Sequence, residues 1–203
     1  MLRERIPAVR DLRAASKRKA TAALARTPHL FGEIRQPETE YLCIPKVVSE
    51  TRPYLTAERL EPDVIVSDLA FHAQDPDGFL FSLVSSSMFV TWQRAVGGRL
   101  ESRLRFSNTF VWNTFPVPLL DAATRQRIID AGELVRWARE QHPERSLAKL
   151  YNPLAMAPEF LKAHDKLDRE VDKAFGASRK LTTERQRQEL LCSNYAELTS
   201  QTG

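Results

Sequence analysis

An arginine-rich segment in the middle of the chain is the part whose residue types and spacing best suit chemistry. A helix-like run ends at two adjacent glycines, and an extended run follows with Arg99, Arg103 and Arg105 at odd positions. Side chains alternate between the two faces of a strand, so Arg103 and Arg105 share one face. The intervening Leu104 and the following Phe106 point to the other face. A strand with one cationic and one apolar face is half-buried and suits contact with a polyanion.

Glu50 and Arg52 form a second pair with chemical potential, two residues apart in a β-like run. At that spacing both side chains project from the same face of a strand. A carboxylate can accept a hydrogen bond from cytosine N4, and a guanidinium can bind guanine O6 and N7. One such pair could therefore read both members of a G·C base pair. The alternative is a same-face or cross-strand salt bridge, which contributes little on a soluble sheet. From the residue types alone, the salt bridge is the simpler interpretation.

Positive charge is concentrated along the chain. The net charge is +4, but residues 1–35 contain nine Lys and Arg against three acidic residues. The triplet Lys17-Arg18-Lys19 lies in this segment and is either a solvated helix face or a surface for an anionic partner. Arginine outnumbers lysine 22 to 8, a bias that a GC-rich genome explains. Clustering is more informative, because phosphate binding needs several cations within one Debye length.

Length and composition indicate a globular protein with its own core. The 203 residues are enough for one large domain or two small ones, and 42% hydrophobic with 28% charged residues is ordinary for such a chain. No apolar run approaches the length of a membrane span, and the arginine-rich start lacks the apolar core of a signal peptide. Cys43 and Cys192 are far apart and have no metal-ligand or disulfide spacing. This usage favours a reducing cytoplasm and argues against structural zinc.

The pattern of apolar residues and turn formers predicts an α+β chain. A basic helix is expected over residues 3–25, interrupted early by Pro7. A helix over residues 79–96, with apolar residues at i, i+4 spacing, precedes the arginine strand, and a second strand is expected over residues 109–115. Short strands separated by proline and glycine are also expected at residues 41–44, 46–52, 64–67 and 69–73.

After residue 118 the sequence is typical of helices, so a soft domain boundary is expected there. Asp121 is the expected N-cap of a helix to residue 141. Pro158 begins a second helix, which Gly176 ends. Thr183 and Gln186 form a capping box for a third, from residue 184 to about residue 198. The positions expected to face the core are Ile128, Ala131, Val135, Ala138, Phe160, Leu161, His164, Leu167, Val171 and Ala174, together with the aromatic residues Phe31, Trp92, Trp112 and Trp137.

Motifs for catalysis are missing from the sequence. Binding of S-adenosylmethionine needs a glycine-rich turn after a strand, whereas the adjacent glycines here end a helix. Asn152-Pro153 lacks the second proline and the aromatic residue of the loop used by DNA amino-methyltransferases, and we interpret it as a turn. None of the eight lysines follows an acid by two residues, as a metal-dependent nuclease would need. We therefore expect no catalytic residue, cofactor or metal site in this chain.

Two polar clusters have simpler interpretations than catalysis. His164 and Asp168 are four residues apart, and without a nucleophile nearby we expect a hydrogen bond on a helix surface. The serines at 85–87 lie within a predicted helix and lack the glycines of a nucleophile elbow, so we expect them to pack.

Three blocks, in the same order, give the chain a family resemblance. The first block is residues 41–54 (YLCIPKVVSETRPY). The second is residues 85–116, which begin with SSSMFVTWQRAVGGRL and end with NTFP. The third consists of the helical segments around 146–153 and 163–168. The sequence resembles the C-terminal target-recognition region of single-chain type II restriction–modification enzymes of the MmeI-like kind. It departs from that pattern at Phe89, where the family favours His, and at Val117, where it favours Trp.

The resemblance implies a DNA target-recognition domain over residues 1–118, which could be truncated at its N-terminus, and a helical C-terminal domain over residues 119–203. The chain would be the sequence-specific, non-catalytic DNA-recognition portion of a type II DNA adenine methyltransferase. A separate methyltransferase domain or subunit would bind S-adenosylmethionine. The expected base-recognition residues are Arg18, Glu50 and Arg52, and the expected phosphate-binding residues are Lys17, Lys19, Arg94, Arg99, Arg103 and Arg105. The alternative is a helical protein–protein interaction subunit that docks on a larger methyltransferase without reading DNA, its arginines paired internally with acids.

Overall fold

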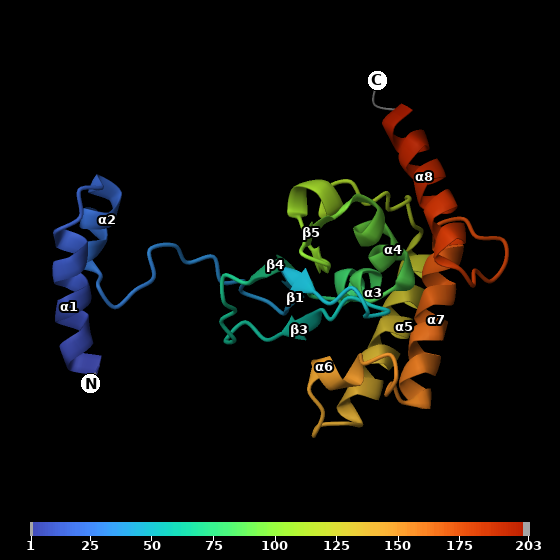
Figure 1. The fold of residues 1–203 in the computed structure, drawn as a ribbon, viewed down its shortest axis with the longest axis horizontal. Coiled ribbons are helices and arrows are strands. Elements are labelled where there is room, and N and C mark those ends of the chain that lie inside the picture. The colour runs from blue at the N-terminus through green and yellow to red at the C-terminus, as the bar shows by residue number, and fades with distance from the viewer. Residues whose placement is uncertain (1, 201–203) are drawn as a thin grey trace. The chain divides into compact units, whose positions relative to one another are not determined.

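The computed structural model of the protein describes residues 2–200, whose contacts divide into two compact units, one up to Gln36 and one from Pro37 onward (Figure 1). The elements of the first unit are helix α1 (Leu2–Ala14), the short helix α2 (Lys19–Ala23) and the 3-10 turn η1 (Leu24–Arg26). The Arg13 guanidinium donates hydrogen bonds to the carbonyl oxygens of Leu24 (3.1 Å), Thr27 (3.0 Å) and Leu30 (2.9 Å). These bonds hold the segment after α2 against the end of α1.

The expected single helix over residues 3–25 is therefore wrong in its middle. Pro7 lies inside α1 without ending it, because so close to the N-terminus its missing N–H removes only one of the first intrahelical bonds. The chain leaves the helix after Ala14 instead, where the Ser16 hydroxyl accepts a hydrogen bond from the Arg18 N–H (3.2 Å). Lys17 and Arg18 consequently lie between the two helices, and Lys19 begins α2.

The second unit begins with an antiparallel sheet of order β3-β1-β4. Its strands are β1 (Tyr41–Pro45), β3 (Glu58–Leu60) and β4 (Ala70–Gln74). Tyr41 and Leu42 are fully buried, so β1 runs through the core between its two neighbours. At Lys46 the chain crosses to a second sheet: its N–H donates to Leu69 (2.9 Å) and its carbonyl accepts from Phe106 (2.9 Å).

The second sheet is also antiparallel, with the order β2-β6-β5. It consists of β2 (Val47–Val48), β5 (Gly98–Leu100) and β6 (Arg103–Arg105), and β5 and β6 form a hairpin. In its register Val47 pairs with Arg105 and Val48 with Leu104.

The strand predictions are confirmed in part. The expected strands at 41–44 and 69–73 correspond to β1 and β4, but only Val47–Val48 of the range 46–52 is a strand, and no strand forms at 64–67. The sequence did not predict β3. This strand is fixed by distant charged groups, since Arg139 donates to the Ala57 carbonyl (2.8 Å) and buried Arg59 binds Glu40 (2.7 Å) and Glu133 (3.2 Å).

Two helices occupy the range in which one was expected. Helix α3 (Phe79–Val84) ends at Ser85, and helix α4 (Ser87–Val96) begins after Ser86, whose hydroxyl caps it by accepting from the Phe89 N–H (3.3 Å). The serine run thus lies at a helix boundary, and the expected packing is confirmed for Ser85 and Ser86, which are fully buried. As expected, α4 ends at the glycine pair, with Gly97 as its C-cap.

The predicted strand over residues 109–115 is wrong. Asn108–Trp112 form a π-helical turn, η2, because Ser107 caps it: its hydroxyl accepts from the Phe110 N–H (3.2 Å) and its carbonyl from the Val111 N–H (2.9 Å). The Trp92 indole N–H then donates to the Val111 carbonyl (3.2 Å) and attaches this turn to α4.

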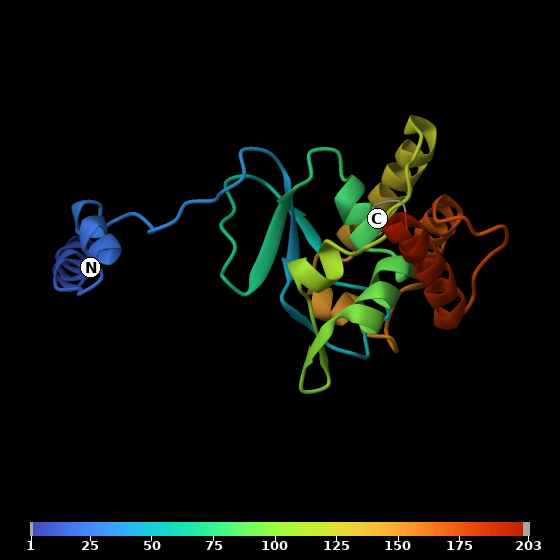
Figure 2. The ribbon, with the colours of Figure 1, turned by 90° about the horizontal axis from the view of Figure 1, so that it is seen from above.

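Helices α5 (Ala122–Glu140), α6 (Leu147–Leu150), α7 (Pro158–Ala174) and α8 (Glu184–Ser200) complete the chain, and the α+β class is confirmed. Figure 1 shows α5 beside α7, and Figure 2 views the same helices from above. The N-cap at Asp121 and the capping box of Thr183 and Gln186 both form as predicted. Gly176 follows α7 with a φ of 102°, a conformation that glycine adopts without strain.

One core joins the residues on either side of position 118. Phe106 and Val111 belong to the same cluster of buried residues as Ile128 and Val171. Of the expected core positions, Leu161 is exposed, and so are two aromatic residues: Phe31 is 73% exposed and Trp137 is 56% exposed. Trp92 is buried, and Trp112 packs against the core. Between residues 2 and 200 the structure contains no helix with the length and apolar character that a membrane crossing needs.

Candidate nucleic-acid interface

The β5–β6 hairpin presents the cationic face expected from its sequence. Arg103 and Arg105 are exposed, whereas Leu104 and Phe106 between and after them are 2% and 5% exposed. The predicted alternation of a cationic and an apolar face is therefore confirmed. Arg103 forms an ion pair with Glu101 (2.9 Å), but both side chains are largely exposed, so the pair contributes little and its arginine can exchange partners.

Arg99 lies on the opposite face of this hairpin from Arg103 and Arg105, although all three occupy odd positions in the sequence. Strands β5 and β6 are joined by a two-residue turn, Glu101–Ser102, in which Glu101 has a φ of 58°. The resulting register pairs Arg99 with Leu104, and directly paired residues share a face. The Arg99 guanidinium bends back to donate to the Ser102 carbonyl (3.2 Å). The hairpin thus carries positive charge at its tip on both sides.

Glu50 and Arg52 lie in a turn and not in a strand, which corrects the sequence prediction. Strand β2 ends at Val48, and the Arg52 N–H donates to the Ser49 carbonyl (3.2 Å) across the segment that we call the 49–52 turn. The period-two argument does not apply in a turn, so the two side chains need not share a face. Among the described residues, no ion pair joins Glu50 to Arg52.

The Glu50 carboxylate faces the hairpin. Its own backbone N–H, the Ser102 side chain and the positive charges of Arg99 and Arg103 lower the pKa of Glu50. It is therefore an ionised acceptor beside a cationic surface at neutral pH. Arg52 is half-buried, and its positive charge is among those that oppose the rise in the pKa of the Tyr151 hydroxyl caused by burial. In the part of the chain that the structure describes, no group accepts a hydrogen bond from the Arg52 guanidinium.

The last turn of α4 holds both segments of this surface. The Gln93 side-chain amide donates to the Arg105 carbonyl (3.0 Å) in β6. Its neighbour Arg94 donates to the Arg52 carbonyl (2.9 Å) in the 49–52 turn and to Glu184 in α8 (2.7 Å). Gly97 is needed for this arrangement, since a Cβ there would lie 2.1 Å from the Gln93 amide nitrogen. Arg94 was expected to bind phosphate, but its guanidinium is occupied within the protein.

A buried polar cluster anchors the chain immediately after the 49–52 turn. The Tyr54 ring stacks on His164 with centroids 3.8 Å apart, and its hydroxyl donates to Asp168 (3.2 Å). Asp168 also accepts from the N–H (2.7 Å) and the hydroxyl (2.6 Å) of Ser87 at the start of α4. The turn is therefore fixed at its C-terminal side by helix α7.

His164 and Asp168 do not form the surface hydrogen bond that their spacing suggested. Both are buried, and the His164 Nε2 pairs with the Tyr151 hydroxyl (3.1 Å) instead of Asp168. Burial and the charge of Arg139 lower the pKa of His164 well below its ordinary value, so the ring is neutral at pH 7. Ser87 is likewise engaged with Asp168. These polar groups are structural partners of one another.

The basic triplet lies in the first unit. Lys17, Arg18 and Lys19 are all exposed at the junction between α1 and α2. Their side chains are available to a ligand of that unit.

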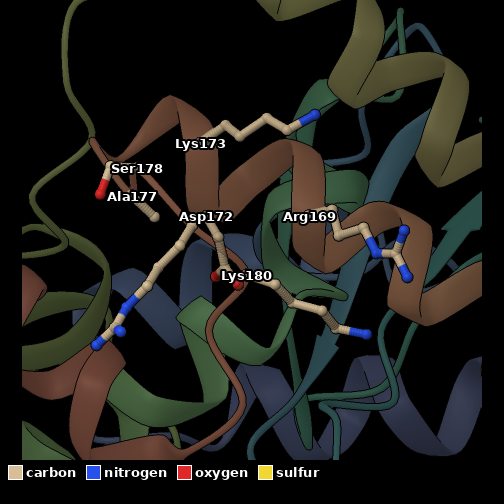
Figure 3. A pocket seen from close by; sticks show the side chains of 7 residues that line it. Arg169, Asp172, Lys173, Ala177, Ser178 and Lys180 are labelled. Atoms are coloured by element: carbon tan, nitrogen blue, oxygen red, sulfur yellow. The ribbon is translucent and has the colours of Figure 1, made fainter.

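A cavity of about 240 Å³ lies at the end of α7 and is lined by Arg169, Asp172, Lys173 and Lys180 (Figure 3). Its charges are largely neutralised by neighbours. Arg169 and Lys180 both contact Asp165 (2.6 and 2.5 Å), and Lys173 contacts Glu170. Figure 3 shows the Lys173 amine pointing away from Asp172. Between residues 2 and 200, no group of three or more His, Cys, Asp or Glu side chains is arranged to hold a metal ion.

Comparison with known proteins assigns the chain to a family. A family model described as "MmeI, target recognition domain" matches residues 1–119, and a second, "MmeI, C-terminal domain", matches residues 120–202. The chain belongs to the MmeI family. The resemblance predicted from the sequence is thereby confirmed.

A curated relative and a solved structure agree with this assignment. DNA methyltransferase A of Bacillus subtilis (strain 168) is 33% identical over 199 residues, which are 98% of this chain and 22% of the relative. The solved structure is that of the Type IIL restriction-modification enzyme MmeI in complex with DNA, which is 39% identical with a TM-score of 0.87. That match covers 98% of this chain and 26% of the MmeI chain. The chain thus spans about a quarter of the length of these proteins.

Proposed function

We propose that this MmeI-family chain is the sequence-specific DNA-recognition portion of a type II DNA adenine methyltransferase or restriction–modification enzyme. The observation that carries the proposal is the exposed cationic face of the β5–β6 hairpin beside the 49–52 turn. This turn offers an ionised acceptor, Glu50, and the Arg52 guanidinium, which donates no hydrogen bond to any residue between 2 and 200. Both kinds of group occur in base readout. The MmeI structure that this chain matches was solved with DNA, which supports the proposal.

In this proposal the DNA phosphates are bound by exposed cations, which position the protein without reading sequence. The residues assigned this role are Lys17, Lys19, Arg99, Arg103 and Arg105. Glu50 and Arg52 read a G·C base pair, and Arg18 contributes a further base contact. Glu50 accepts from cytosine N4 and Arg52 donates to guanine O6 and N7.

We assign target recognition to residues 1–118, and structural support of that recognition surface to residues 119–203. The buried contacts of Tyr54 with Asp168 and His164 favour that division of labour, because they fix the end of the 49–52 turn on α7. A methyltransferase portion outside this chain would bind S-adenosylmethionine, flip the target adenine and methylate its amino group. The relative named DNA methyltransferase A supports that part of the proposal. The site of action would be the cytoplasm, where DNA is found and where Cys43 and Cys192 stay free thiols.

A salt titration of duplex DNA binding tests the proposal against a protein–protein interaction subunit. Each phosphate contact adds about 0.9 to the slope of log K against log salt concentration. Arg103→Ala with Arg105→Ala should therefore weaken binding to all duplexes alike and flatten the slope by roughly 2. The matched control is Arg179→Ala, which removes an exposed positive charge at the α7 cavity. Equal slopes in the wild-type chain and the double variant would contradict the assignment of the hairpin as the docking surface.

A further inference from the structure

Arg94 joins three parts of the second unit through one guanidinium. Its Nη1 donates to Glu184 in the first turn of α8 (2.7 Å). Its Nη2 donates to the carbonyl oxygens of Arg52 (2.9 Å) and Glu50 (3.4 Å). The side chain is only 24% exposed. A phosphate would have to displace the Glu184 carboxylate to reach it, so the expected role in phosphate binding does not fit these contacts.

The two carbonyl groups that Arg94 holds belong to the residues proposed to read bases. Each carbonyl is bonded to the same Cα that carries the Glu50 or Arg52 side chain, so fixing it restricts the direction of that side chain. The planar guanidinium suits this task because its donors have a fixed geometry. Beyond the turn, the chain is held at Val48 by strand β2 and at Tyr54 by the Asp168 cluster. Arg94 supplies an anchor between these two points.

We propose that Arg94 is a positioning residue for base recognition, which sets the 49–52 turn while Glu184 orients and neutralises its guanidinium. This inference rests on the proposed function, in which Glu50 and Arg52 of the 49–52 turn contact a base pair. It also explains why the C-terminal helices accompany the recognition surface: α8 supplies the carboxylate that keeps Arg94 in place. Recognition groups need to be held to within a fraction of an ångström, so losing this anchor should affect specificity more than general affinity.

The test compares Arg94→Lys, Arg94→Ala, Glu184→Gln and Arg179→Ala with the wild-type chain. Arg94→Lys keeps the charge and the possible pair with Glu184, but a single ammonium cannot reproduce the planar fork. Glu184→Gln keeps an oxygen acceptor and removes the negative charge. Arg179→Ala is the matched control for loss of one positive charge. For each variant, affinity is measured for the duplex that the wild-type chain selects from a random pool, for its single-base-pair variants, and against salt.

Hydrogen exchange of the Arg52 amide gives a readout that needs no DNA, since this N–H is bonded to the Ser49 carbonyl. In Arg94→Lys and Arg94→Ala it should exchange about tenfold faster, as local opening becomes easier. Discrimination should fall about tenfold at the base pair that Arg52→Ala also relaxes and hold at the others. In Arg94→Lys the salt slope should stay unchanged. Glu184→Gln should change amide exchange and base-pair discrimination in the same direction but by a smaller factor. Arg179→Ala should leave both unchanged.

Two results would overturn the proposal. A salt slope that falls by about 0.9 in Arg94→Ala, with discrimination and amide exchange unchanged, would make Arg94 a phosphate contact. Unchanged exchange of the Arg52 amide in both Arg94 variants would show that Arg94 does not hold the turn. If the wild-type chain binds duplexes without sequence preference, the proposed function fails instead, and amide exchange alone then decides whether Arg94 positions this segment.

Discussion

Replacing Asp168 with alanine should destabilise the second unit by about 3 kcal/mol. The carboxylate accepts the N–H and the hydroxyl of Ser87 at 2.7 and 2.6 Å, and the hydroxyl of Tyr54 at 3.2 Å. Alanine would leave three donors without this partner, one from buried Tyr54 and two from half-buried Ser87, and hydrogen bonds to a charged group contribute roughly 1.5–3 kcal/mol each. Burial of the carboxylate opposes that gain and raises the pKa of Asp168. The expected net loss is therefore well below the sum of the three bonds.

Urea unfolding, followed by tryptophan fluorescence and circular dichroism, measures this loss. Tyr54→Phe removes one donor and keeps the ring stacked on His164, so it should cost about 1 kcal/mol. Asp168→Asn keeps one acceptor oxygen for the Ser87 N–H and should lie between Tyr54→Phe and the alanine variant. A cost below about 1 kcal/mol for Asp168→Ala, at unchanged m-value, would refute the reasoning that this carboxylate ties α4 and the segment after the 49–52 turn to α7.

Three further outcomes follow from the same geometry. Gly97→Ala should destabilise the fold by about 1–3 kcal/mol in thermal unfolding, because the new Cβ would collide with Gln93. Gly98→Ala should be tolerated, because a Cβ there has no atom within 4 Å. Equal stabilities of the two variants would refute this. Glu50→Lys combined with Arg52→Asp should favour the reversed orientation of one G·C pair among selected duplexes, and an unaltered consensus would show that the two residues do not read bases. Burial raises the pKa of Asp172 to about 6 from 3.8, so its contribution to stability is fully present below pH 3.8 and is lost as the pH rises through 6. The free energy of unfolding of the wild type minus that of Asp172→Asn should therefore be smaller at pH 7 than at pH 4, by at most about 3 kcal/mol. An increase of this difference with pH would contradict the prediction.

The features that the sequence predicted correctly depend on contacts within a few residues. The Asp121 cap reaches Thr124, and the capping box of Thr183 and Gln186 spans a single helical turn. The alternation around Leu104 is also local, because the cationic and apolar side chains simply take opposite faces of one strand. Such patterns can be read without knowing the rest of the fold.

The errors arose where distant residues decide the local structure. Strand β3 depends on Arg139, about 80 positions further along, which binds the Ala57 carbonyl. The β-branched and aromatic composition of residues 109–115 favours a strand, yet the Ser107 cap starts the turn η2 there and the distant Trp92 of α4 secures it by donating to the Val111 carbonyl. Glu50 and Arg52 were placed in a strand because nothing nearby shows that Arg94 would hold a turn there. The one sequence signal for this arrangement was the Trp92-Gln93-Arg94 block, which belongs to the family resemblance. The block does not reveal that Gln93 and Arg94 hold the hairpin and the 49–52 turn.

Selection of duplexes from a randomised DNA pool by the 203-residue chain tests the central claim most directly. The account predicts enrichment of one short consensus containing a G·C pair whose preference is lost in Arg52→Ala, while the other positions are retained. Arg103→Ala with Arg105→Ala should yield the same consensus with lower recovery, because phosphate contacts carry no sequence information. A pool that remains random after selection by the wild-type chain, despite salt-dependent binding, would contradict the claim that this chain reads DNA sequence.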